Sequence, residues 1–162
     1  KRDLEGFKEL YGRWFIVKMH SRIDSAWDQD IEYRTSHGPV PTGTGFSADE
    51  SDDPHPPDAM TFLPVVKRPG NPEPMQIGIG RSRACDLVLR FAGVSKLHAS
   101  FQIQLDGTLA LYDHDSANGT KVDGVRLEKR KPYQLMSGMQ VAFAGVKLTF
   151  MSAADFREFI TR

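Results

Sequence analysis

Residues 98–112 read HASFQIQLDGTLALY, which is an alternating segment, a turn and a second apolar segment. An apolar side chain at every second position is typical of a β-strand that is buried on one face only. The apolar residues of the first segment, which we expect to share that face, are Ala99, Phe101, Ile103 and Leu105. The Asp106-Gly107 pair is typical of a two-residue hairpin turn. The stretch therefore predicts two neighbouring antiparallel strands.

The same turn chemistry recurs along the chain. Asp123-Gly124 separates segments 120–122 and 125–127, and Ala144-Gly145 separates segments 139–143 and 146–150. Further short apolar segments lie at residues 14–17, 62–66, 76–79 and 86–89. Short strands at this spacing, without helical periodicity between them, indicate a sandwich or a barrel. We predict an all-β fold, a β-sandwich of about ten or eleven strands.

Both ends of the chain show helical patterns. In residues 1–19, apolar residues at three- and four-residue spacing predict a short helix, and a short strand follows. We expect this N-terminal extension to dock on the main domain rather than to form a core of its own. Residues 152–162 predict a C-terminal helix, with Ser152 as its N-cap and Asp155 in its first turn.

Residues 20–59 have the composition of a flexible linker, with Pro and Gly first and acidic residues later. The sandwich domain is then expected to occupy residues 60–151. Thr42 and Thr44 lie in the linker, ahead of its acidic run. If either is phosphorylated, it could be recognised by the same chain or by a second copy, whereas an unmodified spacer is the simpler interpretation.

Bulk properties exclude several classes of protein. Among 162 residues, Lys plus Arg and Asp plus Glu each total 21, so the chain lacks the net positive charge of a typical nucleic-acid binder. No apolar stretch approaches the ~20 residues that a membrane span requires. The scattered histidines show no metal-ligand spacing, so we expect neither a metal nor a cofactor. Cys85, the single cysteine, is expected to be buried and structural, which fits a reducing, cytoplasmic location.

Polar residues of the sandwich gather in three segments between strands. These segments are residues 80–83, 93–98 and 114–120, and they contain guanidinium, ammonium, hydroxyl and amide donors. Phosphate is bound by charged donors, especially by the fork of an arginine, together with neutral donors that fix its orientation. If alternate strand ends bring the three segments together, they can form a phosphate site at one end of the sandwich.

The order Gly80-Arg81, Ser95-x-x-His98, Asn118-Gly119 resembles the motif pattern of forkhead-associated (FHA) domains. Each motif alone occurs often by chance, but three in this order at strand ends form a specific signal. The resemblance covers roughly residues 60–151. It implies an FHA-type sandwich and a phosphothreonine-dependent protein-protein interaction module in signalling, without enzymatic activity.

The resemblance also implies a role for each motif residue. Arg81 and Ser95 would contact the phosphate, Lys96 would add a further donor, and Asn118 would hydrogen-bond the backbone of the bound peptide. The structural residues of the motifs would be Gly80, His98 and Gly119. The chain departs from the family pattern at Ala117, where a polar side chain that joins the phosphate site is frequent.

Other interpretations of these residues remain open. Arg81 can be an ordinary surface arginine, and Asn118-Gly119 can be a plain turn. The domain can also be a phosphate-independent scaffold that uses another surface. Ser95, His98 and Asp115 supply the side chains of a hydrolytic triad, although the serine lacks the Gly-x-Ser-x-Gly environment of such enzymes.

Overall fold

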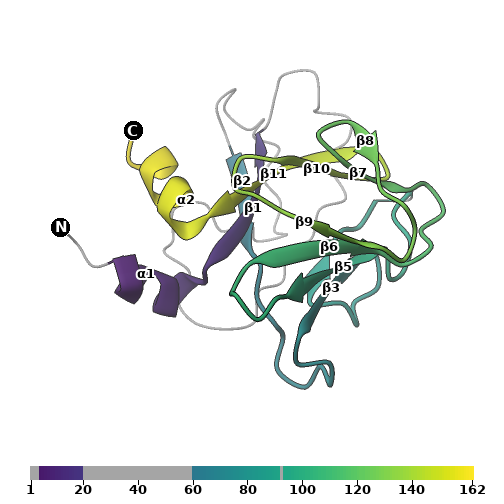
Figure 1. The fold of residues 1–162 in the computed structure, drawn as a ribbon, viewed down its shortest axis with the longest axis horizontal. Coiled ribbons are helices and arrows are strands. Elements are labelled where there is room, and N and C mark those ends of the chain that lie inside the picture. Colours follow the sequence, from purple (N-terminus) through teal and green to yellow (C-terminus); the bar gives the residue numbers. More distant parts are fainter. Residues whose placement is uncertain (1–3, 20–59, 92) are drawn as a thin grey trace, which may run out of the picture.

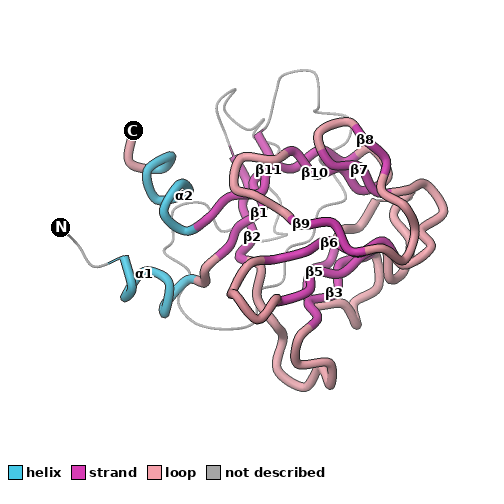
Figure 2. The backbone as a smooth tube through the Cα atoms, viewed as in Figure 1, coloured by secondary structure: helices cyan, strands magenta, loops and turns pink. Residues whose placement is uncertain are grey.

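The computed structural model describes residues 4–19, 60–91 and 93–162. These residues form eleven strands and two short helices. The strands make two sheets that lie one over the other, and both helices lie at one end of the molecule (Figure 1, Figure 2). The predicted all-β sandwich of about ten or eleven strands, with helices towards both ends of the chain, is confirmed.

The first sheet has six strands. Their order is β2 (Met60–Pro64), β1 (Trp14–Met19), β11 (Val146–Ser152), β10 (Gln140–Phe143), β7 (Thr120–Val122) and β8 (Val125–Arg126). The second sheet has five strands, in the order β4 (Leu87–Val88), β3 (Gln76–Gly80), β5 (Ala99–Ile103), β6 (Leu109–Asp113) and β9 (Pro132–Gln134). Paired strands are antiparallel except for β3 and β4, which run parallel.

The core lies between the two sheets and includes a row of aromatic rings. Phe101 of the second sheet lies between Phe143 and Phe150 of the first, with ring centroids 6.4 and 6.3 Å away. All three rings are buried, as are the branched aliphatic residues around them. Side chains of alternate positions on both sheets thus fill the space between the layers, as a sandwich requires.

The two-residue turns predicted at Asp123-Gly124 and Ala144-Gly145 are present, whereas β5 and β6 are joined by the three residues 105–107 rather than by Asp106-Gly107 alone. Asp123 and Gly124 both have positive φ, at 48° and 80°, which defines the turn that matches the twist of two paired strands. One part of the β5 prediction is wrong, because Leu105 is fully exposed rather than buried with Phe101. β5 ends at Ile103, and Leu105 already belongs to the turn before β6. Strand β9 was not predicted, since its three residues are all exposed and carry no alternating pattern.

The N-terminal strand is built into the sandwich. β1 pairs with β11 on one side and with β2 on the other, so it is an inner strand of the first sheet. For β1, the expected docking on the main domain takes the form of an inner strand, whose backbone hydrogen bonds complete the sheet. Whether residues 60–151 mark the boundaries of the domain stays a prediction.

Two helices cover the outer face of the first sheet beside β1. Helices α1 (Leu4–Tyr11) and α2 (Ala153–Ile160) pack against Phe15 of β1. The ring of Phe156 in α2 stacks on the ring of Phe15, with centroids 4.2 Å apart. Ser152 caps α2 as predicted, and its side chain accepts a hydrogen bond from the amide of Asp155. No helix in the described residues is long and apolar enough to cross a membrane. The predicted linker, with Thr42 and Thr44, lies outside the described residues.

Candidate functional site

Three connections meet at the end of the sandwich that faces away from α1 and α2 (Figure 1). They join β3 to β4, β4 to β5 and β6 to β7, and they contain all of the predicted site residues except Gly80, which is the last residue of β3. The amide of Arg81 donates to the carbonyl of Ser95 over 2.9 Å, and the amide of His114 donates to the carbonyl of His98 over 3.0 Å. Backbone hydrogen bonds therefore hold the three connections together.

Gly80 allows the closest of these approaches. A Cβ atom at this position would lie 2.3 Å from the carbonyl oxygen of Lys96 and 2.9 Å from the amide nitrogen of His98. Both neighbours are backbone atoms, which cannot move aside as a side chain could. Glycine is thus required where the end of β3 contacts the segment before β5, and this supports the structural role that the sequence predicts for it.

The ring of His98 links the connection between β4 and β5 to the connection between β6 and β7. The ring is completely buried, and its Nδ1 accepts a hydrogen bond from the amide of Ser95 over 3.1 Å. An amide can only donate, so the proton of the neutral ring must sit on Nε2, which lies 3.0 Å from the carbonyl oxygen of Gly119 and donates to it. Burial lowers the pKa of His98 below its ordinary value, although Gly119 and Asp113 oppose the shift. A neutral His98 therefore fixes the Ser95 and Gly119 segments relative to each other.

A buried carboxylate shapes the connection from β6 to β7. Asp113 accepts hydrogen bonds from the amide and hydroxyl of Ser116 and from the hydroxyl of Thr120, at 2.9, 2.7 and 2.6 Å. The Ser116 hydroxyl in turn accepts from the amide of Gly119. Burial alone would raise the pKa of Asp113, but these hydrogen bonds outweigh it and the pKa lies below its usual value. The loop that presents Asn118 is thus held by an ionised anchor.

Arg81 and Ser95 each keep hydrogen-bond donors that no described residue uses. Arg81 donates from Nε to the carbonyl of Val94 over 3.1 Å, which orients the guanidinium, and its two terminal nitrogens make no hydrogen bond to a described residue. The hydroxyl oxygen of Ser95 accepts from the amide of Ala117 over 3.0 Å. Its own proton can therefore be donated to a bound group. Ala117 brings no polar side chain, but its amide orients the serine hydroxyl.

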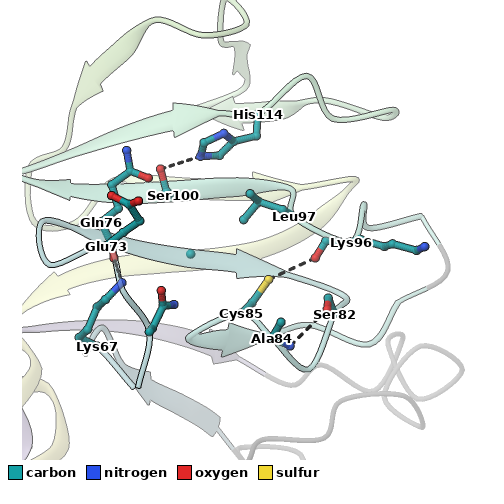
Figure 3. A pocket seen from close by; sticks show the side chains of 12 residues that line it. Lys67, Glu73, Gln76, Ser82, Ala84, Cys85, Lys96, Leu97, Ser100 and His114 are labelled. Atoms are coloured by element: carbon teal, nitrogen blue, oxygen red, sulfur yellow. Dashed lines mark hydrogen bonds between the residues drawn. The ribbon is translucent and has the colours of Figure 1, made fainter. Parts of the chain in front are cut away.

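Asn118 and Lys96 lie at the same end of the sandwich as Arg81 and Ser95, and this end is called the rim below. The side-chain nitrogen of Asn118 donates to the carbonyl of Gly93 over 2.8 Å, and the second N–H and the oxygen of the amide make no hydrogen bond to a described residue. Lys96 is exposed, and its side chain extends away from the sheet (Figure 3). Hydrogen bonds join Arg81 to Ser95 and join His98 to Ser95 and Gly119. Lys96 contributes to this framework through its backbone carbonyl, which lies against Gly80.

The geometry does not provide a hydrolytic triad. Neither ring nitrogen of His98 is directed at the Ser95 hydroxyl, since one accepts from the Ser95 amide and the other donates to Gly119. Asp115 is exposed and forms an ion pair with Arg130. A general base must reach the proton that it removes, and here the histidine is already engaged on both sides.

A hollow of about 300 Å³ lies on the outer face of the second sheet, next to the rim (Figure 3). Its walls include Ser82, Leu97 and Cys85. Cys85 is buried and free, as the sequence predicts, and burial together with Asp86 raises the pKa of its thiol to about 11. The thiol therefore stays protonated at neutral pH and is a poor nucleophile.

The sequence did not reveal every residue that shapes this end of the sandwich. Asp113, Ser116 and Thr120 look like ordinary polar residues of a strand end and a loop, and only the structure shows that they are buried and mutually bonded. Arg126 was not selected either, although its guanidinium lies directly over Gly119. A basic residue two positions after a hairpin turn carries no signal of its own that would indicate such a contact.

The neutral state of His98 predicts that the domain loses stability in mild acid. The unfolded chain takes up a proton near the ordinary histidine pKa of 6.5, but the folded chain resists protonation because the pKa of His98 is lowered. The free energy of unfolding should therefore fall as the pH drops below about 6.5, before carboxylates titrate. Urea unfolding between about pH 7.5 and 5 measures this.

The pKa of His114 is lowered too, so the pH series needs a control. A His114→Asn variant removes that second contribution and should keep most of the acid sensitivity. A free energy of unfolding that stays constant in this variant over the same pH range would contradict the neutral, doubly bonded His98.

The family model described as FHA domain matches residues 77–144. Similar solved structures include an engineered FHA with a Myc-pTBD peptide, at 20% identity over 91% of this chain and 98% of that chain, with a TM-score of 0.50. The N-terminal FHA domain of Rad53p from S. cerevisiae, in complex with a phosphothreonine peptide, is 28% identical over 52% of this chain and 73% of that chain, with a TM-score of 0.45.

EmbR of Mycobacterium tuberculosis, in complex with a low-affinity phosphopeptide, is 27% identical over 48% of this chain, with a TM-score of 0.43. The match spans only 20% of the EmbR chain. No curated protein matches this chain. The matched family region contains all three motifs, from Gly80-Arg81 to Asn118-Gly119. Residues 77–144 of this chain therefore match the FHA domain family.

Proposed function

We propose that this domain binds proteins through a phosphorylated threonine, at the rim formed by Arg81, Ser95, Lys96 and Asn118. The proposal is supported by hydrogen-bond donors of Arg81 and Ser95 that take no part in the hydrogen bonds between the three connections. Arg81 keeps two guanidinium nitrogens, and Ser95 keeps its hydroxyl proton. The two residues belong to segments joined by the 2.9 Å hydrogen bond from the Arg81 amide to the Ser95 carbonyl. Their donors would therefore bind the same phosphate.

A phosphothreonine suits these donors electrostatically. It carries nearly two negative charges at neutral pH and three acceptor oxygens. Arg81 and Lys96 would supply the compensating charge, and the Ser95 hydroxyl would supply a neutral donor. Because the framework is already bonded without ligand, little ordering entropy would be lost on binding. Asn118, anchored on Gly93, would then hold the peptide backbone beside the phosphothreonine.

We further propose that the domain acts as a binding module in signalling and not as an enzyme. The hydrogen bonds of His98 support this, because they occupy the group that would have to serve as general base. A cytoplasmic location fits the single free cysteine.

The proposal is tested with three degenerate peptide libraries that share a fixed central residue: threonine, phosphothreonine or phosphoserine. We expect no binding of the threonine library, and binding of the phosphoserine library about fivefold weaker than that of the phosphothreonine library, since one lost methyl contact costs about 1 kcal/mol. Equal binding of the unphosphorylated library would favour the alternative, a phosphate-independent scaffold that uses another surface.

A further inference from the structure

Arg126 lies next to the residue that is proposed to hold the peptide backbone. A Cβ atom at Gly119 would lie 2.8 Å from both Cζ and Nε of Arg126, so the guanidinium covers the backbone directly after Asn118. Gly119 is itself buried, whereas Arg126 is exposed on its outer side. Strand β8 runs back from the Asp123-Gly124 turn and thereby returns Arg126 to this end of the sandwich.

The charge of Arg126 is not compensated within the part of the chain that the structure describes. Its guanidinium has no hydrogen bond or ion pair to any described residue. The carboxylates of the neighbouring segment are engaged elsewhere, because Asp113 is bonded inside its loop, Asp115 pairs with Arg130, and Glu128 pairs with Lys131. Arginine in this position presents a planar fork that matches a carboxylate or a phosphate.

The number of positive charges on the rim exceeds what one phosphate needs. A phosphothreonine carries at most about two negative charges, which Arg81 and Lys96 would already balance. Arg126 is a third cation at the same rim, beside Asn118 rather than beside Arg81. A second negative group on the peptide, close to the phosphothreonine, would be placed where this third cation lies.

We propose that Arg126 is a specificity residue that selects ligands with a second acidic group, a carboxylate or a second phosphate, flanking the phosphothreonine. This inference rests on the proposed function of the rim. In the complex, the guanidinium of Arg126 donates to that acidic group while Asn118 holds the intervening backbone. The selection comes from a charge-assisted pair at an exposed site, so it is moderate in size and weakens with salt.

The probe is a phosphothreonine peptide with alanine at all flanking positions, in which each flanking alanine is replaced in turn by glutamate or by phosphoserine. We expect one or two positions at which either replacement tightens binding roughly three- to tenfold at low salt. In R126Q this advantage should disappear, while the affinity for the all-alanine peptide stays nearly constant. The matched control is K121Q, because Lys121 is the exposed cross-strand partner of Arg126 and carries the same charge.

The outcomes separate this inference from the function on which it rests. No binding of any phosphothreonine peptide would refute the proposed function itself. Binding without a preferred acidic position, or a preference that survives in R126Q or is lost equally in K121Q, would refute the role of Arg126 alone. A preference for phosphoserine without one for glutamate would identify the second group as a phosphate, and the reverse as a carboxylate; either is consistent with Arg126 as its donor.

Discussion

Replacing His98 by alanine is expected to lower the free energy of unfolding by about 3–5 kcal/mol. The ring is fully buried and packs edge-on against Phe143 with centroids 5.7 Å apart, so its removal leaves a cavity. The amide of Ser95 and the carbonyl of Gly119 lose their partner at the same time. For a domain of ordinary stability this is a large share of the total, and urea unfolding monitored by circular dichroism measures it.

His114→Ala serves as the matched control for that experiment. This histidine is only half-buried, and its ring makes a single hydrogen bond, to the hydroxyl of Ser100. Its removal should cost about 1 kcal/mol. An unfolding midpoint of His98→Ala close to that of His114→Ala would show that His98 does not hold the two connections together.

Replacing Arg81 by alanine is expected to weaken phosphothreonine-peptide binding by about a hundredfold with little change in stability. Charge-assisted bonds from a guanidinium to a phosphate are worth about 2–3 kcal/mol in total when they are lost. Among the described residues, the side chain of Arg81 makes one hydrogen bond, from Nε to the carbonyl of Val94, and the substitution removes it from the folded state. Calorimetric titration and thermal unfolding measure the two effects separately.

Arg83→Ala is the matched control, because Arg83 is exposed two residues further along the same connection and its side chain makes no hydrogen bond or ion pair with a described residue. It should bind the peptide within about twofold of the original chain, given the small effect of a distant surface charge. Retained affinity in Arg81→Ala, or an equal loss in Arg83→Ala, would place the phosphate elsewhere.

The sandwich was predictable because its strands follow simple rules. Alternation revealed β5, and paired turn residues revealed the hairpins at Asp123-Gly124 and Ala144-Gly145. The prediction that Leu105 is buried failed, because this residue continues the alternating pattern of the sequence although the backbone has already left the strand and entered a turn. Strand β9 could not be predicted, because it is an exposed edge strand without a buried face and its sequence therefore shows no alternation of apolar and polar residues.

The site was predictable only in its motif residues. The motifs that resemble those of FHA domains could be found in order along the chain, and they contain Gly80, Ser95, His98 and Asn118. The buried anchor Asp113 could not be found this way, because its three hydrogen bonds depend on how the loop folds back. Long-range contacts raise the same difficulty: the place of β1 inside the first sheet follows from pairing with β11, more than a hundred residues later in the sequence.

Backbone amide shifts in heteronuclear NMR spectra test the central claim most directly, with the phosphothreonine library and its unphosphorylated twin as titrants. The account predicts shifts at Arg81, Ser95 and Asn118 that occur with the phosphorylated library only and leave α1 and α2 unchanged. Shifts of equal size with both libraries, or shifts confined to the helices or to the hollow around Leu97, would contradict it.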